Sequence, residues 1–164
     1  MNATNLVTQE RRHPLDNRVP PPLVVVLIGM AMAAIAWFTP AIEIGSNVRF
    51  VDGGIAIALG ALVVVQGART FWRNKTTINP VDLDNASSLV TSGVFRFSRN
   101  PMYVGFTAML VGWAVCLASP WVLLGPVAFV LFTNRFQIIP EERVMRAKFG
   151  QAYDDYRAQV RRWL

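Results

Sequence analysis

Four apolar runs divide this chain, and polar intervals separate them. The runs are Leu23 to Thr39, Gly53 to Phe71, Met102 to Ala118 and Trp121 to Phe136. At about 1.5 Å per residue, helices of about 17 to 20 residues cross a hydrocarbon layer of about 30 Å only when nearly upright. We therefore predict an all-α, polytopic membrane protein with about four transmembrane helices, a cytoplasmic loop and a C-terminal amphipathic helix.

The intervals predict how these helices connect. Only Ser119 and Pro120 separate the last two runs, which therefore form an antiparallel hairpin. The longest polar interval, Trp72 to Asn100, is expected to be an ordered loop that covers a site, because loops of this length are usually functional or disordered. Beyond Pro140, apolar residues recur every three or four positions. This spacing predicts an amphipathic helix, broken at Gly150, that lies on the membrane face or against the loop.

The distribution of basic residues predicts the orientation of the chain. Lys and Arg concentrate in the N-terminal segment, the long interval and the C-terminal tail, and are scarce elsewhere. Because such residues stay inside, both termini and the long loop should be cytoplasmic, with the protein in the bacterial inner membrane. We expect one integrated domain: residues 1–22 form the N-terminal segment, residues 23–71 the first two helices, and residues 72–164 a cofactor-binding catalytic region.

Composition narrows the function classes. Hydrophobic residues make up 53% of the chain and charged residues 16%, which favours a membrane protein over a soluble core. The net charge of +6 is not arranged as a basic stripe with interleaved aromatics, so no nucleic-acid partner is expected. The single Cys116 and the single His13 predict no disulfide, no metal site and no histidine-based triad. The oligomeric state stays open.

Two polar clusters at the membrane edge carry the candidate chemistry. Arg96 and Arg99 stand just before the third apolar run, and Glu141 and Glu142 just after the fourth. A helical hairpin between them returns the acidic pair to the arginines and closes a polar site on one membrane face. Two simpler interpretations compete: the arginines could anchor to lipid phosphates, and the glutamates could favour the first turn of a helix starting at Pro140.

The two clusters also follow a family pattern. Residues 93–105 read Gly-Val-Phe-Arg-Phe-Ser-Arg-Asn-Pro-Met-Tyr-Val-Gly, and Glu141-Glu142 stand ahead of Phe149-Gly150, Tyr153 and Tyr156. This order, over roughly residues 90 to 164, resembles the isoprenylcysteine carboxyl methyltransferase and phospholipid methyltransferase superfamily of integral membrane enzymes. Two positions depart from that family: Asn100 replaces its usual histidine, and Arg162 stands where a proline is usual.

The resemblance implies a methyltransferase that uses S-adenosylmethionine. Glu142 is expected to accept hydrogen bonds from the ribose or adenine, and Arg96 or Arg99 to pair with the methionine carboxylate. We predict Arg99 and Glu142 as catalytic residues. The predicted cofactor-binding residues are Arg96, Arg99, Asn100, Pro101, Tyr103, Glu141 and Glu142.

The methyl acceptor is left open by the sequence. The acceptor is expected to be amphiphilic and to reach the site from the bilayer: an isoprenylcysteine carboxylate, a phospholipid amine or a small hydrophobic molecule. The alternative is a noncatalytic membrane scaffold or transporter subunit, although transporters usually place polar groups at midplane rather than at one edge.

Four residues of this region receive structural interpretations. Asn100, followed by Pro101, is expected to cap the third helix. Arg162 is expected only to loosen the end of the tail. Tyr153 and Tyr156 are expected to pack within the terminal helix.

Overall fold

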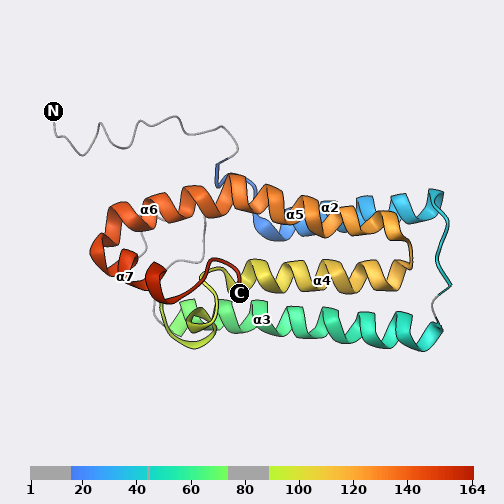
Figure 1. Cartoon of the computed structure of the whole chain (residues 1–164), viewed down its shortest axis with the longest axis horizontal. Helices are drawn as coiled ribbons and strands as arrows, with labels where there is room; N and C mark the ends of the chain where they lie inside the picture. The colour runs from blue at the N-terminus through green and yellow to red at the C-terminus, as the bar shows by residue number, and fades with distance from the viewer. Residues whose placement is uncertain (1–15, 44, 74–88) are drawn as a thin grey trace.

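The computed structural model describes residues 16–43, 45–73 and 89–164, and in this part of the chain it contains helices and no strand (Figure 1). The first three helices are α2 (Pro21–Phe38), α3 (Gly53–Arg73) and α4 (Pro101–Leu117). A π-helical segment, η1 (Val48–Asp52), leads into α3. The prediction of an all-α protein is therefore confirmed.

The fourth rod is a single helix, Pro120–Phe149, built from four consecutive segments. They are η4 (Pro120–Leu123), α5 (Leu124–Thr133), the π-helical η5 (Asn134–Ile138) and α6 (Ile139–Phe149). Its 30 residues correspond to about 45 Å, which exceeds the hydrocarbon layer of about 30 Å. The rod is therefore longer than the predicted span, which ended at Phe136, and α6 extends past the bundle (Figure 1).

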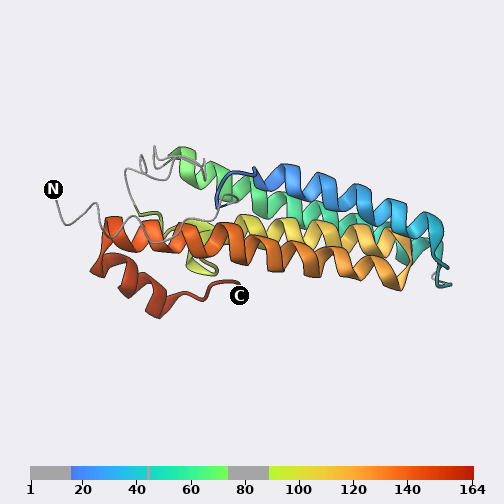
Figure 2. The ribbon, with the colours of Figure 1, turned by 90° about the horizontal axis from the view of Figure 1, so that it is seen from above.

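Pro140 was expected to begin a separate helix, but the helix continues through it. Proline has no N–H to donate and its ring clashes with the carbonyl four residues earlier, here that of Phe136. The wider π-helical segment directly before Pro140 accommodates the ring. The released carbonyl of Phe136 accepts the N–H of Asn17 at 2.9 Å. The break comes instead at Gly150, where φ is +53° and α7 (Gln151–Gln159) turns back, as predicted (Figure 2).

The hairpin between α4 and the fourth rod forms as expected. Ala118 adopts a left-handed conformation with φ of +52°, which ends α4. Ser119 is extended, and Pro120 occupies the first helical position of η4, where a missing N–H costs nothing. The chain therefore reverses within two residues and brings both long helices back to the same end.

Glycines hold α3 and α4 in close contact along what we call the glycine seam. It consists of Gly53, Gly60 and Gly67 on α3 and Gly105 and Gly112 on α4, all buried. A Cβ atom on Gly105 would lie 2.6 Å from the carbonyl oxygen of Gly60, and one on Gly112 would lie 2.6 Å from that of Gly53. Because glycine has no side chain, the two backbones come into direct contact here.

The outer faces of the helices are apolar. Large apolar side chains are exposed on every rod, among them Met30, Leu59, Leu62, Val111 and Leu131. Three rods are long and apolar enough to span a membrane: Pro21–Phe38, Val48–Arg73 and Pro120–Phe149. The fourth, α4, is apolar but has 17 residues, so the count of four spans stays a prediction. The chain is a membrane protein whose lipid-facing surface surrounds the bundle.

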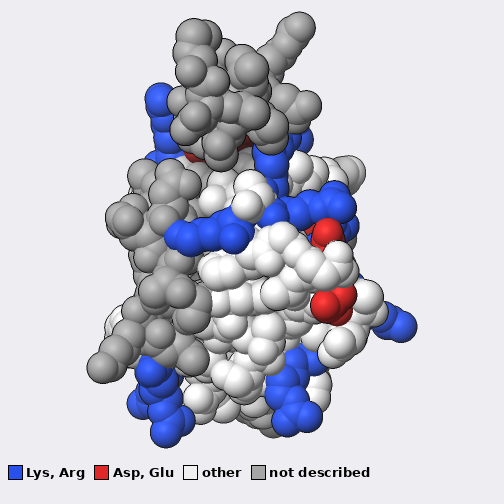
Figure 3. Space-filling view, turned by 90° about the vertical axis from the view of Figure 1, so that its left-hand side faces the viewer, with Lys and Arg blue, Asp and Glu red and all other residues white. Residues whose placement is uncertain are grey.

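One end of the bundle collects the polar elements. The start of α4, the end of α3, α6, α7 and the C-terminus all lie there, whereas the opposite end holds the turns between α2 and η1 and between α4 and η4 (Figures 1 and 2). Figure 3, which faces the polar end, shows many Lys and Arg side chains and few Asp and Glu. Most of the predicted cofactor-covering loop, residues 74–88, lies outside the described residues.

Candidate functional site

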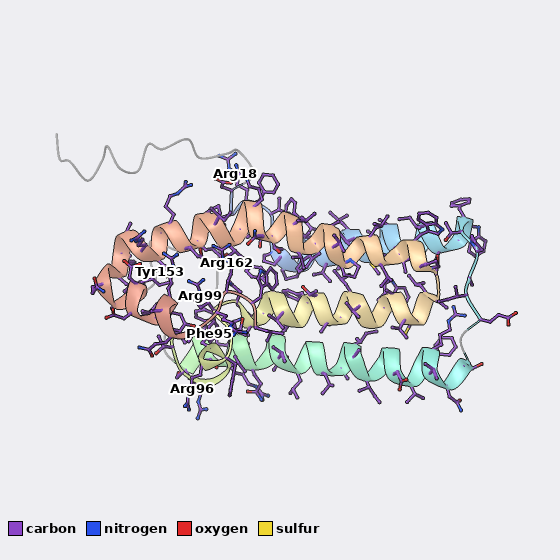
Figure 4. All side chains as sticks on the ribbon, in the orientation of Figure 1. Arg18, Phe95, Arg96, Arg99, Tyr153 and Arg162 are labelled. Carbon is purple, nitrogen blue, oxygen red and sulfur yellow. The ribbon has the colours of Figure 1, made fainter. Side chains whose placement is uncertain are left out.

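Three charged side chains meet at this end, and we call them the Arg99–Glu142–Arg162 cluster. Arg99 Nη2 lies 3.1 Å from Glu142 Oε1, and the two side chains are only 10% and 13% exposed. Arg162 binds the same carboxylate with both arms of its fork, Nη2 to Oε2 at 2.6 Å and Nε to Oε1 at 3.0 Å. The hairpin thus brings Arg99 and Glu142 together as predicted, and the tail adds a second arginine (Figure 4).

The C-terminal tail, Val160–Leu164, is fastened to the residues before α4. The N–H of Arg99 donates to the carbonyl of Arg161 at 3.0 Å. The Asn100 side-chain amide donates to the carbonyl of Arg162 at 2.9 Å, and Ser98 Oγ accepts the Asn100 N–H at 3.0 Å. The bonds to the carbonyls of Arg161 and Arg162 join two segments about sixty residues apart in the sequence.

Asn100 therefore does not cap α4 with its side chain, so that prediction is wrong. The structure shows no capping hydrogen bond from this residue, since its amide is directed to the tail. Pro101 does occupy the first helical position of α4 and is buried. Asparagine often caps helix starts, but here its side chain bonds to a segment that is distant in the sequence.

Arg162 does not loosen the tail either. Besides its two bonds to Glu142, its Nη1 donates to Asn134 Oδ1 at 3.2 Å, at the π-helical segment η5. Hydrogen bonding to Glu142 raises the pKa of Arg162, so the guanidinium is held in its charged form. Neither the spacing nor the residue type of Arg162 indicated this pairing in the sequence.

Arg99 retains unused hydrogen-bonding capacity. Its Nε and Nη1 atoms are buried, and neither has a hydrogen-bond partner among the described residues. Buried donors of a charged group are costly when unpaired, so such atoms point to a missing acceptor. A carboxylate has the charge and the lone pairs that these N–H groups require.

Glu141 and Glu142 face different partners, as consecutive residues on one helix must. Tyr103, buried on the first turn of α4, donates its hydroxyl to Glu141 Oε1 at 2.6 Å. The helix runs unbroken through this region from Pro120, so the acidic pair does not sit at an open helix start with unpaired N–H groups. The helix-dipole interpretation of the pair therefore loses its basis.

Tyr153 and Tyr156 on α7 are buried, which confirms their predicted packing role. Tyr156 also donates its hydroxyl to the carbonyl of Phe95 at 2.7 Å and so fastens the 3₁₀ turn η3 (Gly93–Arg96) beneath α7. Burial, with a further contribution from Glu142, raises the pKa of Tyr153 to about 12. Both tyrosines are therefore uncharged side chains that pack beside the charged cluster.

Arg96 is not brought into the cluster. It ends η3, is exposed, and points away from Arg99 and Arg162 in Figure 4. Of the predicted residues, the structure gathers Arg99, Asn100, Pro101, Tyr103, Glu141 and Glu142 at one end of the bundle. The roles of all seven in binding a cofactor stay predictions.

Several curated proteins resemble the chain. It is 40% identical over 63 residues to an uncharacterized protein of Haemophilus influenzae, which covers 38% of this chain and 100% of that protein. It is 32% identical over 111 residues to a probable protein-S-isoprenylcysteine O-methyltransferase of Oryza sativa subsp. indica, covering 66% of this chain. Protein-S-isoprenylcysteine O-methyltransferase A of Arabidopsis thaliana is 34% identical over the same share. No solved structure matches the chain significantly.

The two plant proteins are longer than this chain, which spans about half of their length, 56% and 55%. A sequence model of the phospholipid methyltransferase family matches residues 48–152. That range begins at η1 and ends within α7, so it includes the glycine seam, Arg99 and both glutamates. With well over half of its residues matched, the chain belongs to the phospholipid methyltransferase family.

Proposed function

We propose that this protein is an integral membrane methyltransferase that uses S-adenosylmethionine. The observation that carries the proposal is the Arg99–Glu142 pair, which two helices bring together at one end of an apolar bundle within the family's matched range. When bound, S-adenosylmethionine supplies an activated methyl group on a sulfonium, so the protein's own task is to orient the donor and exclude water.

The residues present fit such a donor. The unpartnered Nε and Nη1 of Arg99 suit the carboxylate of its methionine part. The Glu142 carboxylate suits the hydroxyls of the ribose or the amine of the adenine as an acceptor. Tyr103 and Tyr153 enclose this region with rings whose hydroxyls stay protonated at neutral pH.

The acceptor is proposed to be amphiphilic. The cluster lies at the end of a bundle whose sides are covered by exposed apolar residues, so a molecule with one apolar and one polar part would meet both surfaces. An isoprenylcysteine carboxylate, which matches the names of the plant relatives, a phospholipid amine, which matches the name of the family, and a small hydrophobic molecule all satisfy this requirement.

We also propose that the site faces the cytoplasm, in a bacterial inner membrane, because basic residues concentrate at the site end. A cysteine at the exposed Gln151, in a Cys116→Ser background, should then resist an impermeant thiol reagent added outside intact cells. Labelling at this position from outside would contradict the proposed orientation.

Calorimetry with S-adenosylhomocysteine tests the donor site. Glu142→Ala and Arg99→Ala should each weaken binding by roughly 1.5 to 3 kcal/mol, because each removes a charge-assisted hydrogen bond. Cys116→Ser, far from the cluster at the other end of α4, is the matched control and should bind as the wild type does. Folded Glu142→Ala and Arg99→Ala proteins with unchanged affinity would remove this site, and a noncatalytic membrane scaffold or transporter subunit would become the better interpretation.

A further inference from the structure

We propose that the C-terminal tail, Val160–Leu164, is a latch over the donor site, and that Arg162 competes with the methyl donor for Glu142. This inference rests on the proposed function, because it assigns Glu142 to the donor. Arg162 departs from the family pattern, which usually has a proline at this position.

The first argument is that Glu142 is nearly saturated. A carboxylate offers about four acceptor positions. Arg162 uses two of them, at 2.6 and 3.0 Å, and Arg99 uses a third at 3.1 Å. A ribose diol, which needs two acceptor positions, must therefore displace at least one guanidinium N–H to bind Glu142 with both hydroxyls.

The second argument is that the unused donors of Arg99 are inaccessible. Its Nε and Nη1 atoms are buried although they lack partners, so no ligand carboxylate reaches them in this arrangement. The tail lies against Arg99, whose backbone N–H is bound to the carbonyl of Arg161. Movement of the tail or of the Arg162 side chain exposes the Nε and Nη1 atoms of Arg99, to which the carboxylate of the methyl donor binds.

The third argument concerns which arginine releases Glu142. The Arg162 side chain is 35% exposed, whereas that of Arg99 is 10% exposed. Arg162 can exchange Glu142 for water without leaving a buried charge, while Arg99 cannot. Because Trp163 packs against the hydrophobic core, release of Glu142 requires only the Arg162 side chain to turn away while the tail backbone keeps this anchor. Arg162 is therefore the partner that leaves, and the latch reduces the apparent affinity to the intrinsic affinity multiplied by the fraction of time the site is open.

The test is titration of S-adenosylhomocysteine into the full chain in nanodiscs. Arg162→Gln should bind about tenfold more tightly than wild type, since the competitor is gone. The matched control is Arg161→Gln, which removes the same charge from the neighbouring, exposed residue and should change affinity by less than about twofold. Should Arg162→Gln fail to fold, Arg162→Lys, which keeps the charge but lacks the fork, should tighten binding by about threefold.

A second measurement needs no ligand. The amide of Arg99 should exchange its hydrogen at least about fivefold faster in Arg162→Gln than in Arg161→Gln, because the latch opens more often. Adding S-adenosylhomocysteine to the wild type should change exchange at this same amide. Equal exchange in the two variants would overturn the latch.

The outcomes separate the two proposals. Weaker or unchanged binding by Arg162→Gln, with wild-type binding intact, overturns the latch, makes Arg162 a positioning residue and leaves the donor site standing. In a Glu142→Gln background, Arg162→Gln should have no further effect, and an undiminished tightening there would show that Glu142 is not the contested group. Absence of binding by every protein, wild type included, would instead remove the proposed function and the latch with it.

Discussion

The glycine seam and the Arg99–Glu142–Arg162 cluster hold the molecule together by opposite means. In the seam, α3 and α4 approach each other closely because glycine has no side chain, so their backbones come into contact. In the cluster, long side chains from three distant segments meet at one carboxylate. At four of its five glycines an added Cβ would lie within 2.8 Å of a carbonyl oxygen, and at Gly67 it would meet the Met102 side chain, so the seam leaves little room for another arrangement.

The cluster, in contrast, has spare capacity and exchangeable partners. The Nε and Nη1 atoms of Arg99 have no hydrogen-bond partner in the part of the chain that the structure describes, and Arg162 is partly exposed. Binding sites must open and close, and such motion is drawn from the less stable parts of a fold. The comparison teaches that the hairpin is fixed by packing, while the site at its end combines packing, such as that of Trp163 against the core, with polar contacts that a ligand could replace.

The largest effect is expected from the seam. Gly60→Ala would place its Cβ 2.5 Å from the carbonyl oxygen of Gly105, and the helices would have to separate. We expect a loss of about 3 kcal/mol in the free energy of unfolding, as for an overpacked core. Reversible unfolding in mixed micelles measures it.

Gly54→Ala is the matched control for this substitution. Gly54 lies six residues earlier on α3, on an exposed face, and nothing lies within 4 Å of a Cβ built there. The same chemical change should be neutral or should stabilise the helix by up to about 1 kcal/mol. Equal destabilisation by both substitutions would show that helix propensity, rather than backbone contact, governs the seam.

An intermediate effect is expected where the two regions join. Tyr103 stands two residues before Gly105 of the seam and donates to Glu141 beside the cluster. Tyr103→Phe would leave Glu141 Oε1 without this donor and should cost about 2 kcal/mol in unfolding free energy. The control is Tyr153→Phe, since the Tyr153 hydroxyl makes no hydrogen bond to any residue that the structure describes. If both variants unfold alike, the Tyr103–Glu141 bond contributes nothing specific.

Elements that follow from local rules were predictable. The apolar runs, the turn at Ser119 and Pro120 and the break at Gly150 depend on residues adjacent in sequence, and the structure has all of them. The meeting of Arg99 with Glu142 followed in turn from the hairpin. In the seam, however, Gly53 makes the close contact whereas its neighbour Gly54 has open space beside it. A single residue shifts the helical face by 100°, and composition alone cannot fix that register.

The tail contacts could not be predicted in this way. Arg162 and Asn100 are 62 positions apart and belong to no periodic pattern, so neither spacing nor propensity indicated that they meet. Pro140 likewise looked like a helix start, because the π-helical segment and the Asn17 N–H that relieve it are visible only in three dimensions. Predictions from local rules failed where a polar group formed its hydrogen bond with a segment distant in the sequence instead of with a neighbouring residue.

The smallest effect is expected from the contact between Asn100 and the C-terminal tail. Asn100→Ala removes one side-chain hydrogen bond, from Nδ2 to the carbonyl of Arg162, and should cost about 1 kcal/mol. Because the bond holds the tail rather than α4, the loss should show as faster hydrogen exchange at the Arg99 amide, with exchange along α4 unchanged. Gln151→Ala is the control, since it removes an amide bond of similar length, 2.8 Å to Asp155 on the exposed face of α7, and should alter neither quantity. A general increase of exchange through the first turn of α4 would mean that Asn100 supports the helix start after all, and the separation between a rigid seam and a releasable tail would lose its sharpest boundary.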